Sequence, residues 1–485
     1  MSYPVIDTKV FENHGDGFGT GSQAQVNELN KALTAGFASD PASQSGGGAL
    51  RVESLDATLK IVSFMMRNIV FYNDIPKSKA YNTVEEYNLL SKYGGRGGFF
   101  ITEGALPRTE DSTYQRKVQF VKFMGTTREI SHPMLLVRPA HGNVVALETK
   151  NGAMWMLERM EESLFNGNDS IISQSFQGLR QQLEEGYSDP NTAGDGRPAV
   201  ADNHILDLRD KPLTEAVFAE ASRIIQDDYY YPTHCFLNYE NHEDFNKIFF
   251  SKGRYQIPVG AENTVGFNTE NVRTAGGLIK LRPDVFLRSD QIPPVVANND
   301  AAPTAPVSAA VAVQAISTSR GFKALEFGTY DYIVTAISKS GESAGVVGTA
   351  SAVVTGGSEE VAITITRGAV AGNDLTTGYK IYRSEKDAGA ASVHKLIKTI
   401  ASAGAVTVFL DGNENLPGRG VAYIGQLDES VMSLRELSPM LKFPLATVAS
   451  SIRWMQLYYN TPIVFRPRAW VIVKNIGRLN VPSLD

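Results

Sequence analysis

The sequence predicts an α+β chain of several domains, in which an all-β domain interrupts a mixed one. Apolar residues recur at helical spacing in residues 143–166 and 214–227. Alternating apolar and polar residues fill 303–425, which is typical of a β-sandwich. Prolines and small polar residues cluster at 293–306 and indicate a domain boundary. At 485 residues the chain also exceeds one ordinary hydrophobic core.

Composition excludes several classes of protein. A hydrophobic content of 42% and a charged content of 20% are those of a globular protein. The net charge of −6 leaves no basic footprint for tight nucleic-acid binding. The single cysteine, Cys235, excludes an intrachain disulfide framework. No apolar run is long enough to span a membrane, and the N-terminus lacks the pattern of a signal peptide.

The first part of the chain predicts short helices joined by glycine-rich links. We expect helices over 22–37, 54–70 and 84–93. Val26, Leu29 and Leu33 form one apolar stripe on the first of these helices. Pro76 ends the second helical region because proline cannot continue a helix.

Residues 99–131 predict a long hairpin. The arm Gln115–Ile130 alternates in part, and the polar tip lies at 107–113. A two-stranded ribbon of this length is not stable alone in water. We therefore expect it to lie on another subunit.

The remaining elements follow in order. Residues 143–166 give the longest helix, with Trp155 and Met156 on or beside its apolar face, and 214–227 give a second one. A buried strand at 234–237 precedes a short helix at 242–250. After the all-β stretch we expect a helix over 444–459 and final strand segments at 463–465 and 469–473.

Two clusters resemble ligand sites but favour ordinary structure. The glycines of Gly15–Gly21 follow no strand, so a flexible segment is favoured over phosphate binding. The group His234, Cys235, His242, Glu243 and Asp244 matches no standard zinc spacing, and a buried strand followed by a helix start explains it better.

Three further candidates are equally weak. Cys235 is flanked by Phe236 and Leu237, which indicates a buried, inert thiol. The acidic run Asp411–Asn415 lacks the full calcium-loop pattern and predicts a hairpin turn. The basic pairs Arg466/Arg468 and Arg282/Arg288 favour surface or intersubunit ion pairs. No catalytic residues, metal ligands or cofactor are predicted, so the chain does not read as an enzyme.

Taken in order, the following segments resemble the major capsid proteins of tailed bacteriophages, which have the HK-ninety-seven fold: Ser54–Leu59, Ile75–Lys77, Tyr81–Asn88, Phe99–Gly104, Phe120–Thr127, Pro232–His234, Asp244–Lys247 and Val471–Gly477. The likeness covers roughly residues 50–300 and 430–477. No single segment is diagnostic, and the ordered set carries the resemblance.

The resemblance implies a division of the chain. It implies an N-terminal arm at 1–60, the start of a peripheral domain with an extended loop at 61–142, and a spine helix with more of that domain at 143–204. A mainly axial domain would follow at 205–300, and 426–485 would return to the core. Only about fifty residues precede the core, which implies a separate scaffold protein and no N-terminal cleavage.

The resemblance also implies a function. Many copies would form pentamers and hexamers of an icosahedral head around double-stranded DNA bound without sequence preference. The chain would be assembled in the host cytoplasm and located in the virion, with scaffold, portal and possible decoration proteins as partners and no membrane. The residues expected at contacts between subunits are Val26, Leu29, Leu33, Glu103, Arg108, Lys117, Arg128, Trp155 and Met156.

The stretch 303–425 resembles an immunoglobulin-like or fibronectin type III domain. Gly328–Ala336 is similar to a late strand of that family and Thr377–Ser384 to a middle one, so the order departs from the standard. Two alternatives remain open at this point. An encapsulin shell would enclose a cargo protein in place of DNA. A surface adhesin would bind through the sandwich and should carry an export signal.

Overall fold

A computed structural model describes residues 66–94, 100–137, 143–186, 204–250, 269–315, 321–369, 375–389, 391–446 and 449–479. The expected helix at 22–37, with Val26, Leu29 and Leu33, lies outside these residues, as does most of 54–70. Apart from positions 143 and 144, the described elements belong to one compact unit, Val62–Val137 with Val145–Asp485. The other unit, Met1–Ile61 with Arg138–Val144, falls almost wholly outside the described ranges.

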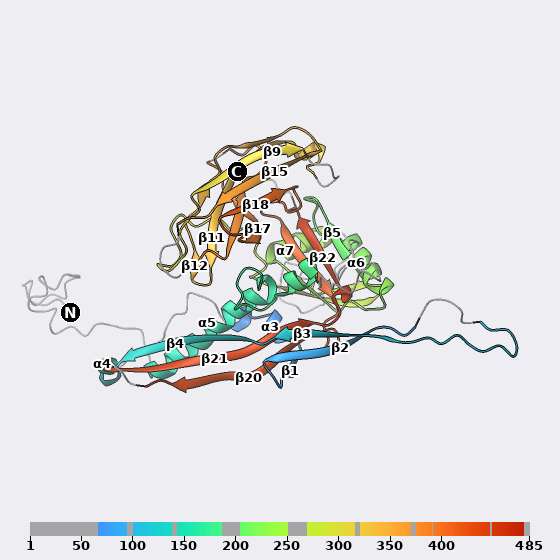
Figure 1. Cartoon of the computed structure of the whole chain (residues 1–485), viewed down its shortest axis with the longest axis horizontal. Helices are drawn as coiled ribbons and strands as arrows, with labels where there is room; N and C mark the ends of the chain where they lie inside the picture. The colour runs from blue at the N-terminus through green and yellow to red at the C-terminus, as the bar shows by residue number, and fades with distance from the viewer. Residues whose placement is uncertain are drawn as a thin grey trace, which may run out of the picture. The chain divides into compact units, whose positions relative to one another are not determined.

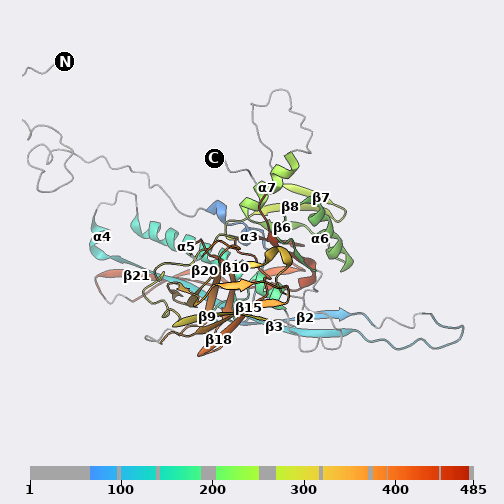
Figure 2. The same cartoon turned by 90° about the horizontal axis from the view of Figure 1, so that it is seen from above.

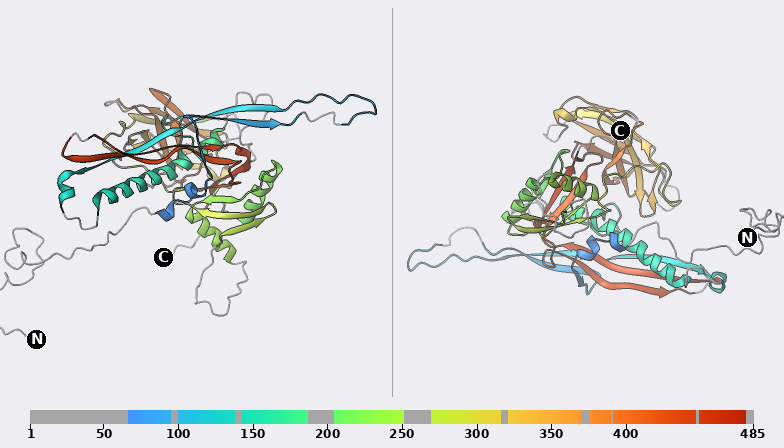
Figure 3. Two further views of the ribbon diagram at one scale, coloured as in Figure 1. Left: turned by 90° about the horizontal axis from the view of Figure 1, so that it is seen from below. Right: turned by 180° about the vertical axis from the view of Figure 1, so that it is seen from behind.

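The first sheet has four long strands in the order β1-β20-β21-β4 (Figure 1). Its members are β1 (Lys77–Lys79), β20 (Met432–Pro444), β21 (Ser451–Val464) and β4 (Lys122–Ser131). The helix α5 (Val144–Asn166) lies along this sheet, as Figure 3 shows. Segments far apart in the sequence thus build one sheet, in which the late strands β20 and β21 lie between the early strands β1 and β4.

The second sheet has six strands in the order β5-β22-β19-β6-β8-β7. They are β5 (Ile205–Asp207), β22 (Trp470–Ile476), β19 (Gly420–Gly425), β6 (His234–Leu237), β8 (Gly277–Pro283) and β7 (Asn271–Thr274). The helices α6 (Glu215–Asp227) and α7 (Tyr239–Phe250) accompany it. A cluster around Phe218, Ile225 and Phe245 packs on one face, and a cluster around Phe165, Phe236 and Trp470 joins the other face to α5.

Residues between β8 and β19 form a β-sandwich with its own core. One sheet has the order β12-β11-β16-β17, with β13 also paired to β11, and the other has the order β18-β15-β9. The strands are β9 (Ser308–Ala315), β11 (Tyr332–Ser338), β12 (Gly341–Glu342), β13 (Val346–Val347), β15 (Glu359–Thr366), β16 (Gly378–Arg383), β17 (Lys395–Ala401) and β18 (Val406–Asp411), with a separate pair β10 (Gly328–Tyr330) and β14 (Ala352–Val354). Val334, Ile363 and Ile381 are buried between the sheets.

The ends of this sandwich differ from the expected 303 and 425. The preceding segment already hydrogen-bonds to its strands, because Leu396 N donates to Gln291 O and Gly345 N donates to Pro294 O. At the other end, β19 pairs with β6 and β22 of the six-stranded sheet. Hydrogen bonding therefore places about 291–411 in the sandwich and returns the chain to the core before β19.

Several predicted elements are confirmed. The helix expected at 143–166 is α5, and the one expected at 214–227 is α6. The strand at 234–237 is β6, and the following helix begins at Tyr239, earlier than expected. The final strand segment expected at 469–473 is β22, whereas 463–464 form the end of β21.

Two predicted helices are wrong. Residues 84–93 form the strand β2 (Val84–Lys92), paired with β3 (Thr113–Phe120). Residues 451–464 form β21, in which Trp454, Gln456 and Tyr458 are buried at every second position. Burial of every second residue fits a strand and not a helix. β20 and β4 pair with β21 on its two sides, and this pairing holds the segment in an extended conformation. The described end of the expected helix 54–70 is a short 3₁₀ turn at Met66–Asn68.

The expected hairpin over 99–131 is also wrong in its pairing. β3 pairs with β2, which precedes it, and β4 pairs with β21 near the end of the chain. Only Val121 separates β3 from β4, so one nearly continuous extended arm serves two different sheets. In Figures 1 and 2 the β2–β3 ribbon continues away from the four-stranded sheet.

Candidate assembly surface

The β2–β3 ribbon has one face held by its own chain. Tyr87 packs edge-on against Phe465 with ring centroids 5.0 Å apart. Glu85 lies 3.6 Å from Arg435, and Gln119 Nε2 donates to Gln177 Oε1 at 3.0 Å. These contacts come from β2 and β3 at the base of the ribbon. The ribbon is therefore anchored at its base.

The opposite face of the ribbon is exposed and combines apolar with charged side chains. The register pairs Val84 with Phe120, Glu86 with Val118, Asn88 with Arg116 and Leu90 with Tyr114, and directly paired residues share a face. Arg116 lies 3.3 Å from Glu86 on this face. Phe120, Val118, Leu90 and Tyr114 are all exposed. Apolar side chains grouped in this way make the face a candidate interaction surface.

The loop beyond the ribbon adds more exposed apolar side chains. Phe100 is 89% exposed and Leu106 is 93% exposed. Every described residue from 100 to 112 is exposed. Fully burying one such side chain stabilises a contact by about 1.5–3 kcal/mol. This loop and the open face of the ribbon together form what we call the ribbon surface.

The predicted contact residues fall in different surroundings. Glu103 and Arg108 lie on the ribbon surface, where Arg108 is paired with Glu110 at 3.5 Å. Lys117 is half-buried on the anchored face. Arg128 lies on β4, 3.6 Å from Glu148 of α5. The structure thus brings only Glu103 and Arg108 together on this surface.

The two candidates on α5 differ. Trp155 is 42% exposed and leaves part of its ring open to a neighbour. Met156 is 5% exposed and belongs to the core under the four-stranded sheet. Because its side chain packs in the core of its own chain, Met156 offers little surface to a neighbouring subunit.

A buried carboxyl pair ties α5 to the start of the described chain. Glu161 is fully buried, and its carboxyl oxygens accept from the backbone N–H groups of Val70, Phe71 and Tyr72 at 2.7, 2.6 and 2.9 Å. Burial and the neighbouring Asp284 raise the pKa of Glu161 to about 8, although the N–H groups of Tyr72 and Phe71 oppose this. Two carboxyl groups buried together share a proton more readily than both ionise.

The sequence pattern did not predict this pair. Glu161 follows Met160 on α5 and precedes Leu164, so a signal was available in the form of a carboxylate beside the apolar stripe. Asp284 lies more than a hundred positions away, and only the fold places it there. Nearby, Arg282 clamps Asp74 with Nε–Oδ2 and Nη2–Oδ1 contacts of 2.5 Å each.

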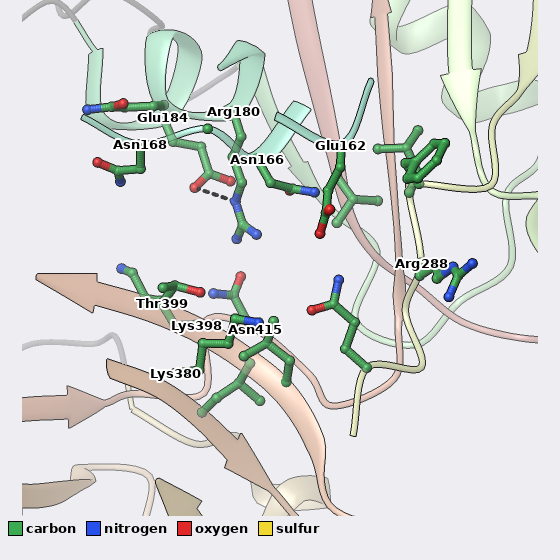
Figure 4. Close-up of a pocket in the computed structure, with 18 of the residues that line it drawn as sticks. Glu162, Asn166, Asn168, Arg180, Glu184, Arg288, Lys380, Lys398, Thr399 and Asn415 are labelled. Carbon is green, nitrogen blue, oxygen red and sulfur yellow. Dashed lines mark hydrogen bonds and ion pairs between the residues drawn. The ribbon is translucent and has the colours of Figure 1, made fainter. Parts of the chain in front are cut away.

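A polar cavity of about 340 Å³ lies between α5, the segment after it and the sandwich strand β17 (Figure 4). Glu184 stands 3.2 Å from Arg180 and 2.8 Å from Lys474. Burial alone would raise the pKa of Glu184, but these two cations lower it to about 2. The carboxylate therefore serves as a fixed negative partner, not as a proton carrier.

The residues that resembled ligand sites have structural partners. Cys235 is fully buried, which raises the pKa of its thiol, and His242 Nε2 lies 2.9 Å from Thr269 O. No group of three or more metal-ligating side chains occurs in the described ranges. Asp411 pairs with the buried Arg383 at 2.6 Å. Across the same residues, no helix is long and apolar enough to cross a membrane.

The basic pairs have partners within their own chain. Besides Arg282 with its aspartate, Arg468 lies 3.5 Å from Asp228. Arg466 lies over the ring of Tyr230, and Arg288 Nε donates to Val285 O at 3.3 Å.

No family model matches the chain. It is similar along nearly its whole length to capsid proteins of phages. It is 26% identical over 462 residues to one from Enterococcus phage phiEF24C, covering 93% of this chain and 94% of that one. It is 24% identical over 477 residues to the major capsid protein of Staphylococcus phage K, covering 94% and 96%.

Solved structures with a similar chain include the capsid of a native GTA particle. There the identity is 9%, the TM-score 0.48, and the coverage 91% of this chain and 100% of that one. An encapsulin complex from Synechococcus elongatus gives 10% identity and a TM-score of 0.37, with coverage of 88% and 95%.

Proposed function

We infer that this chain is a phage major capsid protein, which assembles with copies of itself into the shell of a virion. The observation that carries this inference is the near-complete, end-to-end similarity to phage capsid proteins, because it spans the core and the sandwich alike. The function is structural, and no enzymatic step is assigned to any residue.

The ribbon surface supports assembly as the function. Its base is held by Phe465 and Gln177 of the same chain, so the apolar face is presented in a fixed direction. Exposed apolar side chains on an anchored ribbon gain stability only by covering a neighbour. Copies that each cover the next one form rings when the rotation closes, as pentamers and hexamers do.

The parts of the chain take the roles of an HK-ninety-seven subunit in this proposal. Residues 1–60 form the arm, β2, β3 and the loop between them form the extended loop, and α5 is the spine helix. The six-stranded sheet with α6 and α7 is the axial domain. The four-stranded sheet belongs to the peripheral domain. Modest contacts of each part add up across many neighbours, which is how a shell gains stability.

The sandwich at about 291–411 is, in this proposal, an immunoglobulin-like insertion on the outside of the shell. It has a separate core around Val334, Ile363 and Ile381 and so does not depend on the capsid core for its packing. A scaffold protein, a portal and packaged double-stranded DNA are the further partners. The net charge of −6 suits a wall that must not hold DNA tightly.

Electron microscopy of the purified full chain tests the function. We expect closed icosahedral shells, formed alone or with the scaffold protein of the same phage. Shells isolated from infected cells should contain nuclease-protected DNA, whereas a copurified enzyme without DNA would indicate an encapsulin-like compartment. A chain that stays monomeric with its scaffold present contradicts the proposal.

Two deletions locate the assembly function. Removing 102–112, which is exposed and contains no strand, should leave a folded subunit that no longer forms shells. Replacing 291–411 by a short glycine-serine linker should still permit shells, because the two capsid sheets lie outside it. If the first deletion still gives normal shells, the ribbon surface is not required for assembly.

A further inference from the structure

The sandwich has an outer sheet face with an ordered set of uncharged side chains. In the β18-β15-β9 sheet, register pairs set three rows across the strands. The rows, written from β9 through β15 to β18, are Ser308–Thr366–Val406, Ala310–Thr364–Val408 and Ala312–Ala362–Leu410. A fourth row joins Gln314 to Glu360. We call these residues the outer face; Figures 1 and 2 show the three strands.

The outer face is not needed for the sandwich's own core. The alternate residues Ala309, Val361, Ile363 and Ile365 point inward and are buried. On the outer face, Val406, Val408 and Leu410 are each about half exposed. A solvated sheet face normally alternates to polar or charged residues. Three branched apolar side chains on one strand therefore call for a partner.

The chemistry of the outer face disfavours a charged partner. Among its described residues Glu360 alone is charged, and Gln314 Nε2 donates to that carboxylate at 2.6 Å. A charged or strongly polar partner would lose water there without gaining ion pairs. The matching surface must itself be apolar and nearly uncharged.

The outer face is complementary to itself. Bulky side chains stand along β18 and small ones along β9, with Thr and Ala between them on β15. Consider a second copy related by a two-fold axis that runs parallel to β15, in the plane between the two facing sheets. This rotation places the second copy's β18 over the first copy's β9. Val408 of each copy then meets Ala310 of the other, so a ridge fills a groove twice, as in an isologous contact.

The area of the outer face indicates whether this contact is stable between free subunits or only within a shell. Three strands at about 4.8 Å spacing, with 8, 8 and 6 residues at about 3.3 Å rise, cover roughly 350 Å² per copy. A stable interface between free proteins buries about 800 Å² per partner. The contact is thus too small to hold two free subunits and suits copies that a shell already holds close together.

We propose that the outer faces of two sandwiches from neighbouring subunits pack on one another across a local two-fold axis in the assembled shell. This inference rests on the proposed function, which supplies the neighbouring copies. The occupant is a second copy of this chain, and the contact clamps adjoining subunits on the outside of the shell.

Charge substitutions in full-length shells test the contact. Val408→Glu and Ala310→Lys each place an unpaired charge against an apolar partner. Each should shorten the half-life of shells in a fixed urea concentration by at least about tenfold. The double variant pairs the two charges across the two-fold axis and should recover most of the loss. Val393→Glu, on an exposed loop of the same sandwich, is the matched control and should leave the half-life unchanged.

The outcomes separate the inference from the function. Single variants as durable as the wild type overturn the contact and leave the shell function intact. Weak single variants without recovery in the double variant also overturn it, since a different protein then covers the face. Limited proteolysis of the soluble variants checks that the sandwich is folded. If the wild type forms no shells, the proposed function fails, and the contact, which needs copies held close together in a shell, fails with it.

Discussion

Replacing Glu161 by alanine should destabilise the capsid core strongly. Glu161 is the acceptor for three backbone N–H groups, those of Val70, Phe71 and Tyr72, and it is fully buried. A buried N–H left without a partner costs about 1–3 kcal/mol. Water entering the vacated space offsets part of this cost. We expect the free energy of unfolding to fall by about 3–4 kcal/mol.

Urea unfolding followed by tryptophan fluorescence measures this loss. Trp454 and Trp470 are buried on β21 and β22 of the two core sheets. The third tryptophan, Trp155, also lies in the core domain, and the sandwich has none. The signal therefore reports the core alone. The titration should be run at a concentration where light scattering shows single subunits.

The neighbouring position supplies a matched control. Glu162 follows on the same helix with its side chain 44% exposed, and it pairs with Arg159 at 3.2 Å. Such a pair contributes less than about 1 kcal/mol, so Glu162→Ala should change the free energy of unfolding by less than that. If Glu161→Ala costs no more than Glu162→Ala, the three N–H contacts do not hold the start of the core, and the reasoning fails.

The other predictions concern pH, the sandwich and assembly. The pKa of Glu161 is about 8 in the folded chain against 4.5 when unfolded, so the folded chain keeps a proton that the unfolded chain releases. The free energy of unfolding should therefore fall as pH rises from about 4.5 to about 8. Glu161→Gln should flatten this pH dependence in the same urea titrations. Asp411→Ala leaves the fully buried Arg383 without its carboxylate and should destabilise the sandwich by about 3–5 kcal/mol. Protease should then cut rapidly within 291–411, while the tryptophan fluorescence of the core stays unchanged. If the variant resists protease as well as the wild type does, the prediction is wrong. Val118→Lys on the open ribbon face should reduce the yield of shells in electron micrographs by at least about tenfold. Lys117→Ala on the anchored face should leave the yield unchanged. Similar yields from the two variants would argue against a role of the ribbon surface in assembly.

The tertiary structure decided the places where local pattern was ambiguous. Residues 444–459 carry enough apolar residues at helical spacing to predict a helix, yet Pro444 ends β20 and 451–459 belong to β21. The reason lies in partners far away, since β4 and β20 pair with it on both sides. Burial of the polar Gln456 and Asn460 at alternate positions then suits a strand whose side chains reach α5.

The sequence by itself determined the elements whose periodicity extends over several turns, as in α5 and α6, because one apolar stripe admits one way to bury it. It also determined the all-β stretch and the buried Cys235. Strand pairing was decided only by the fold. β3 pairs with β2 and β4 with β21 because pairing is a contact between distant residues. The partnership of Glu161 with Asp284 has the same physical cause: each carboxyl is visible in the sequence, but their proximity exists only after the chain has folded.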